Sequence, residues 1–129
     1  MTLSEYQNLA MRTNDGKCTL RLAQYIADAN DEPEIYAMIG ELLNGALGLT
    51  GEAGEVADMI KKHIFHGHDL TPEDLVKELG DVCWYLALIS HACGISIEHI
   101  MEQNIEKLKK RYPDGFSTEK SINRAEGDI

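Results

Sequence analysis

The fold is decided by residues 50–81, which read TGEAGEVADMIKKHIFHGHDLTPEDLVKELGD. Apolar residues recur at helical spacing on both sides of Gly67, and glycine commonly ends a helix. Thr71 and Pro72 then give a typical helix start, an N-cap followed by proline in the first turn. The stretch therefore predicts two helices joined by a short loop, which favours antiparallel packing.

Helical patterns extend in both directions, and no strand-like alternation of useful length interrupts them. Thr2 opens a capping box, Ser96 can cap a last long helix, and a short helix is expected over about 20–29. Asn30 to Pro33 should separate that short helix from the next. We predict an all-α, antiparallel bundle of four to five helices, forming a single domain over residues 1–129 with a polar, mostly irregular tail over 116–129.

Glycine interrupts the longest helical pattern, which runs from Ile35 to about His66. Each glycine costs about 1 kcal/mol relative to alanine in a helix interior. The helix either bends or breaks near residues 48–51, or its small residues let a neighbouring backbone or ligand approach. We favour a helix that makes room beside its acidic residues. The glycines are Gly40, Gly45, Gly48, Gly51 and Gly54.

The charge balance excludes one class of function. Twelve basic residues stand against 22 acidic ones, a net charge of −10, so a nucleic-acid-binding surface is not expected.

No apolar run approaches the roughly 18 residues of a membrane span, and no secretory signal is evident. Three cysteines without a CxxC pair indicate free thiols, expected to be buried at Cys83 and Cys93. These features point to the cytoplasm.

Two pairs of acids stand three residues apart on successive predicted helices: Glu52 with Glu55, and Glu78 with Asp81. A three-residue step leaves both carboxylates of a pair on one helix face, where like charges repel. Packing the two helices together would gather four acids, with Mg²⁺ (or Mn²⁺) as the compensating charge by ligand hardness. The alternative is two solvated acidic faces.

Other candidate site residues are ambiguous. Lys62 shares a face with Glu55 and would contact an anionic ligand or simply pair with acids. Tyr85 projects near Asp81, where it would border a bound ligand or pack in the core. The histidines near Gly67 suit a transition metal or ordinary solvent exposure; they are His63, His66 and His68.

Residues 44–117 resemble the MazG-like all-α nucleoside triphosphate pyrophosphohydrolases. The motifs that carry the resemblance are Gly51-Glu52-Ala53-Gly54-Glu55, Glu78-Leu79-Gly80-Asp81, Asn104-Ile105-Glu106-Lys107 and residues 111–117, RYPDGFS. The resemblance implies Mg²⁺-dependent hydrolysis of a (d)NTP at the α-phosphate, giving (d)NMP and pyrophosphate. The metal ligands would be Glu52, Glu55, Glu78 and Asp81, with Glu55 as a possible base, and the phosphate contacts Asn104, Lys107 and Arg111.

One position departs from the family pattern. Many members carry a further Glu where this chain has Gly51, which leaves the residue that positions the water unassigned. Two alternatives stay open: a narrow-specificity relative acting on dUTP, dCTP or phosphoribosyl-ATP, and a non-catalytic helical interaction or regulatory protein. The one-faced helices and the resemblance also predict a homotetramer or homodimer.

Overall fold

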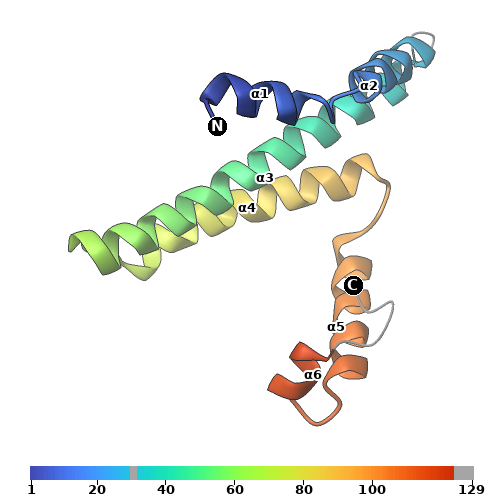
Figure 1. Cartoon of the computed structure of the whole chain (residues 1–129). Helices are drawn as coiled ribbons and strands as arrows, with labels where there is room; N and C mark the ends of the chain where they lie inside the picture. The colour runs from blue at the N-terminus through green and yellow to red at the C-terminus, as the bar shows by residue number, and fades with distance from the viewer. Residues whose placement is uncertain (30–31, 124–129) are drawn as a thin grey trace.

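The computed structural model describes residues 1–29 and 32–123, and this part of the chain is all-helical, as predicted (Figure 1). The described residues include no strand. They form six helices, one more than the four to five predicted. The helices are α1 (Leu3–Met11), α2 (Lys17–Asp28), α3 (Pro33–His66), α4 (Pro72–Ala92), α5 (Ile97–Arg111) and α6 (Thr118–Ile122).

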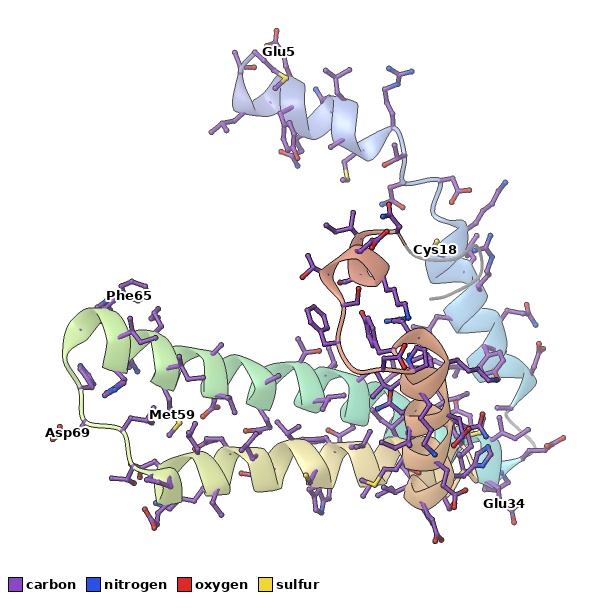
Figure 2. The ribbon with its side chains drawn as sticks, turned by 90° about the horizontal axis from the view of Figure 1, so that it is seen from below. Glu5, Cys18, Glu34, Met59, Phe65 and Asp69 are labelled. Atoms are coloured by element: carbon purple, nitrogen blue, oxygen red, sulfur yellow. The ribbon has the colours of Figure 1, made fainter. Side chains whose placement is uncertain are left out.

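The centre of the molecule is the antiparallel hairpin of α3 and α4, which run side by side over most of their length (Figure 1). Gly67 ends α3 with a left-handed φ of 72°, a conformation that glycine adopts without strain. Thr71 begins α4 through a reciprocal capping box with Asp74. Figure 2 places Met59 between the two helices and Phe65 on the side of α3 away from α4.

Helix α3 is continuous over 34 residues, so its glycines do not break it. Two of them instead allow α4 to approach closely. A Cβ atom added to Gly45 would lie 2.5 Å from Cγ1 of Ile89, and one added to Gly48 would lie 2.2 Å from the Tyr85 ring. Of the two alternatives that the sequence left open, a bend near residues 48–51 or the close approach of a neighbouring element, the structure shows the close approach at Gly45 and Gly48.

The N-terminal helices stand apart from this hairpin. The Thr2 capping box that begins α1 is confirmed, with Glu5 closing it. Helix α2 begins at Lys17, three residues before the predicted start, after Gly16 in the left-handed conformation. The predicted boundary at Asn30 and Asp31 lies outside the described residues, and α3 takes Pro33 in its first turn as expected.

The C-terminal part turns away from the hairpin at Gly94, which has a φ of 64°. Ser96 caps α5 as predicted, and α5 leaves α4 at an angle of 102° (Figure 1). The tail is less irregular than expected, because Ser117 caps the short helix α6. Residues 124–129 of the predicted tail lie outside the described part.

Little of this single chain is buried. Among the described residues, Ala29 and Ile39 are the buried hydrophobic side chains. The prediction that Cys83 and Cys93 are buried is wrong, since both thiols are exposed. Periodicity indicates that Cys83 lies on α4 and Cys93 at its C-cap, but it does not determine whether another element packs over them.

No single described helix is both long enough and apolar enough to cross a membrane. The pair formed by α4 and α5 meets that test only when the two helices are taken together across their bend.

Candidate metal centre

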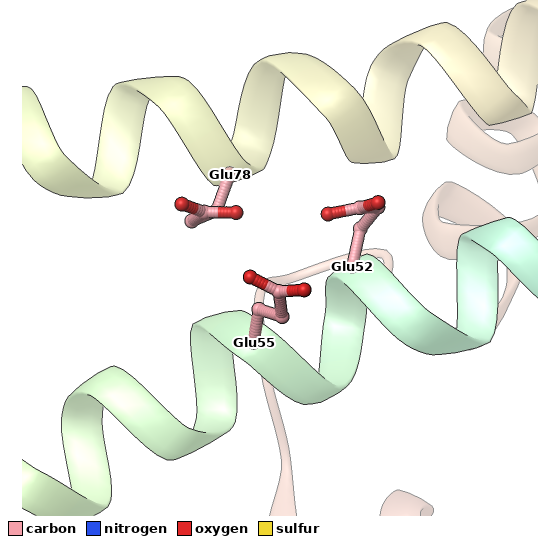
Figure 3. Close-up of side chains that lie close together, drawn as sticks. All are labelled: Glu52, Glu55 and Glu78. Atoms are coloured by element: carbon pink, nitrogen blue, oxygen red, sulfur yellow. The ribbon is translucent and has the colours of Figure 1, made fainter.

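Three carboxylates converge between α3 and α4 (Figure 3). Glu52 and Glu55 reach from α3 toward Glu78 on α4, and one oxygen of each lies within 4.8 Å of the others. Glu52 and Glu78 are half-buried and Glu55 is exposed. Within the described residues, no other group of acids, histidines and cysteines meets this spacing.

The spacing follows from helix geometry and from the pairing of the two helices. Residues three apart fall on one face, so Glu52 and Glu55 project together, and Gly48 one turn earlier lets α4 come close enough to bring Glu78 opposite them. Gly51 and Gly54 have open space beside them. A side chain at either position would meet no neighbour, so these two glycines are not required for the packing of α3 against α4.

The electrostatic cost of this convergence is concentrated on Glu52. Desolvation raises the pKa of its carboxyl, and the negative charges of Glu55, Asp81 and Glu78 raise it further. Asp81, the fourth predicted ligand, thus lies near enough to act on Glu52, although it is not one of the three converging residues. An acidic oxygen-only donor set of this kind fits a hard divalent cation such as Mg²⁺.

Lys62 is engaged by an acid of its own helix. Its Nζ atom lies 2.5 Å from Asp58, which also bonds Lys61. Hydrogen bonds from these two lysines lower the pKa of Asp58 to about 2, and Asp58 in turn raises the pKa of Lys62. Of the two interpretations that the sequence left open, pairing with an acid is the one the structure shows.

Tyr85 packs against α3. Its ring covers Gly48 and meets the Trp84 ring edge-to-face, with centroids 4.9 Å apart. The neighbouring Trp84 is 56% exposed on α4. The sequence placed Tyr85 near the acids but did not predict its contact with Gly48. The two residues lie on different helices, so their contact depends on how α3 and α4 pack together.

The three candidate phosphate-binding residues lie on α5, away from the carboxylates. Asn104 and Lys107 line an open groove along one side of α5. Arg111 is half-buried, with its guanidinium carbon 6.0 Å from the centre of the Tyr112 ring. Because α5 diverges from the hairpin (Figure 1), a single chain does not bring these residues to the three converging acids.

The histidines near Gly67 do not form a metal-ligand group in the described chain. His63 uses Nδ1 in a contact of 2.8 Å with the carbonyl oxygen of His68. The His66 and His68 rings lie 6.4 Å apart in a tilted arrangement. The solvent-exposed interpretation of these residues therefore accounts for their positions.

Comparison with known proteins bears on this arrangement of acids. Residues 41–116, more than half of the chain, match the MazG nucleotide pyrophosphohydrolase domain. The chain belongs to the MazG family. Its MazG domain contains all four candidate ligands as well as α4 and α5, whereas α1 and α2 lie outside it.

Two relatives share the MazG region. The chain is 37% identical over 83 residues to the Gene 37 protein of Mycobacterium phage L5, a match covering 60% of this chain and 72% of the relative. It is 32% identical over 74 residues to the uncharacterized protein YvdC of Bacillus subtilis (strain 168), covering 50% and 69%. No solved structure matches the chain. The names of these relatives state no substrate, so they add none to the MazG assignment.

Proposed function

We propose that the chain is a Mg²⁺-dependent nucleoside triphosphate pyrophosphohydrolase that converts a (d)NTP to (d)NMP and pyrophosphate. The observation that carries the proposal is the convergence of Glu52, Glu55 and Glu78 within 4.8 Å inside the MazG region. Like charges at that spacing are unfavourable by themselves. A divalent cation held by these carboxylates would offset the repulsion and would supply positive charge to the phosphates of a nucleotide.

In this proposal the four acids share one task and Glu55 has a second. Glu52, Glu55, Glu78 and Asp81 would hold a divalent cation, which would neutralise charge at the phosphates. Glu55 is the most exposed of the converging three, and we assign to it the proton of the attacking water. Oxygen from that water bonds the α-phosphorus, the bond from the α-phosphorus to the bridging oxygen breaks, and pyrophosphate leaves.

The proposal gives α5 the task of binding phosphates through Asn104, Lys107 and Arg111. Since α5 diverges from the hairpin in one chain, we also propose a homo-oligomer, a dimer or a tetramer, in which α5 of another copy would approach the carboxylates. Lys62 and Tyr85 would act at the edge of the site, Lys62 while paired with Asp58 and Tyr85 from its place over Gly48. We assign the activity to one domain and, from the three free thiols, to the cytoplasm.

Pyrophosphate release from a panel of ribo- and deoxyribonucleoside triphosphates, with Mg²⁺ or with chelator, tests the proposal. We expect Mg²⁺-dependent release from at least one nucleotide, and losses of about 100-fold or more for Glu55→Gln and Asp81→Asn. Glu41→Gln is the matched control, because Glu41 lies about four turns before Glu55 on the same side of α3. Absence of release from every nucleotide with Mg²⁺ present would refute the proposal and favour the non-catalytic alternative.

A further inference from the structure

The one buried polar residue among those that the structure describes lies near the end of α4, where the chain turns into α5. This residue, Ser90, is 4% exposed. Its hydroxyl donates a hydrogen bond to the carbonyl oxygen of Ile95. A serine inside a helix commonly points to solvent or bonds the carbonyl four residues earlier. Ser90 instead reaches forward, across the turn that joins the two helices.

Backbone hydrogen bonds close the same turn. The Ile95 N–H donates to the Ser90 carbonyl oxygen over 3.0 Å, and the Gly94 N–H donates to the His91 carbonyl oxygen over 2.9 Å. With Gly94 in the left-handed conformation, these two bonds form a Schellman motif. A hydrophobic contact often joins the first and last residues of this motif. Here the Ser90 hydroxyl bonds the last residue instead and adds a third hydrogen bond to the turn.

The third bond acts on the peptide that leads into α5. The Ile95 carbonyl belongs to the peptide unit shared with Ser96, the residue that caps α5. Fixing this carbonyl therefore fixes the peptide plane from which α5 starts. α4 and α5 make few contacts with each other. The hydrogen bonds of the turn therefore have a large share in holding α5 at 102° to α4 (Figure 1).

The direction of α5 decides where its candidate phosphate contacts lie. Ile95 lines the same open groove as Asn104 and Lys107. Lys107 is about 17 Å beyond Ser96 along the helix at 1.5 Å per residue, so a change of about 10° in the direction of α5 moves it by roughly 3 Å. A shift of that size is enough to break a charge-assisted hydrogen bond, whose length is about 2.7–2.9 Å.

We infer that Ser90 is a positioning residue, whose hydroxyl holds α5 in the direction that places Asn104 and Lys107 at the phosphates of the nucleotide. The inference rests on the proposed function, because it takes these two residues as the phosphate contacts. It applies whichever copy of the chain supplies α5 to a given site, since the turn lies within one chain. Ser90 itself touches neither the nucleotide nor the cation in this assignment.

Steady-state kinetics with a nucleotide that the wild type hydrolyses tests the assignment. Without the hydroxyl, only part of the population has α5 in the competent direction, and the apparent affinity falls by that fraction. We expect Ser90→Ala to raise KM about tenfold with kcat within about twofold, because the carboxylates stay in place. Ser90→Thr keeps a hydroxyl and should restore most of the wild-type KM. The control Thr13→Ala removes a side-chain hydrogen bond to a carbonyl outside the MazG region and should change neither constant.

A double-mutant cycle separates positioning from general destabilisation. In a variant that carries Asn104→Ala and Lys107→Ala, the groups that Ser90 positions are absent. Adding Ser90→Ala to that variant should therefore raise KM by less than about twofold more. An effect of equal size in the presence and absence of the two side chains would overturn the inference.

The direction of α5 is measured without nucleotide, as the distance between one spin label at Cys83 on α4 and another on α5 after Glu102→Cys. Cys18→Ser and Cys93→Ser remove the other thiols, and dilution with unlabelled protein selects distances within one chain. We expect a narrow distance distribution when Ser90 is present and a broader one in Ser90→Ala.

The two measurements fail in different ways. An unchanged distance distribution in Ser90→Ala would overturn the inference whatever the activity. A broader distribution with an unchanged KM would also overturn it, by showing that the direction of α5 does not control nucleotide binding. If the wild type releases no pyrophosphate from any nucleotide, the proposed function fails, and the distances still decide whether Ser90 holds α5.

Discussion

Glu52 stands where three other negative charges raise its pKa, in addition to the effect of desolvation. Because the folded protein favours the protonated form of Glu52 more than the unfolded chain does, ionising this residue destabilises the fold. The metal-free protein therefore gains stability as pH falls from neutral through the raised pKa of Glu52. That gain is complete below the usual value of 4.5.

Mg²⁺ should stabilise the protein most where the acids are ionised. At a free Mg²⁺ concentration one hundred times Kd, we expect about 2.7 kcal/mol of added stability at neutral pH, shrinking as pH falls toward the usual carboxyl range. Glu52→Gln should raise the melting temperature of the metal-free protein and reduce the response to Mg²⁺. Melting curves at pH 7.5 and 4.5, with Mg²⁺ or chelator, measure both effects. An equal Mg²⁺ response at the two pH values would contradict this site.

The Tyr85 ring lies against Gly48, so this position requires a residue without a side chain. Gly48→Ala places a methyl group 2.2 Å from the present position of the Tyr85 ring, and such overpacking typically costs about 1–3 kcal/mol. Gly40→Ala is the matched control, because nothing lies within 4 Å of its Cβ position, and it should add about 1 kcal/mol through helix propensity. Chemical denaturation measures the two. Equal stability of the two variants would show that Tyr85 moves freely.

The helix ends are the elements that local sequence predicted best. Thr2, Thr71 and Ser96 were each predicted as caps, and each accepts the expected backbone hydrogen bond. A cap depends on a few adjacent residues, so its chemistry is readable from the sequence alone. The exposure of Cys83 and the direction of α5 were not predictable, because they depend on which elements pack together.

The same limit applies to the candidate site. The three-residue spacing predicted the convergence of Glu52, Glu55 and Glu78, since it fixes a helix face and needs only the pairing of α3 with α4. Lys62 was ambiguous because its place on the helix face of Glu55 suited either a phosphate contact or pairing with an acid. The structure shows Asp58 as its partner.

Two capping boxes allow an element-scale comparison. Thr71→Ala should lower the free energy of unfolding by about 1 kcal/mol, because α4 is packed against α3 and unfolds with it. Thr2→Ala removes the same kind of cap from α1, which has no buried residue, and should leave the main unfolding transition unchanged. Urea denaturation followed by circular dichroism distinguishes the two. The expectation fails if both variants shift the midpoint equally.

At the scale of the whole molecule, the MazG region is separable from the first helix. α1 has no buried residue and lies outside residues 41–116. Removing residues 1–13 should therefore leave the melting temperature and the Mg²⁺ response within error of the full chain. Thermal melting of the shortened chain checks this. A lost Mg²⁺ response would mean that α1 contributes to the carboxylate site in solution.

The single hairpin that holds the carboxylates also has a kinetic consequence. Glu55 and Glu78 are separated along the chain only by the end of α3, the loop at Gly67 and the first turns of α4. Contacts between residues this close in sequence form early and rapidly during folding, because little loop entropy is lost when they meet. We therefore expect the mutual repulsion of the acids to be present when the hairpin forms, and counter-ions in the surrounding medium to influence how fast the chain reaches its native state.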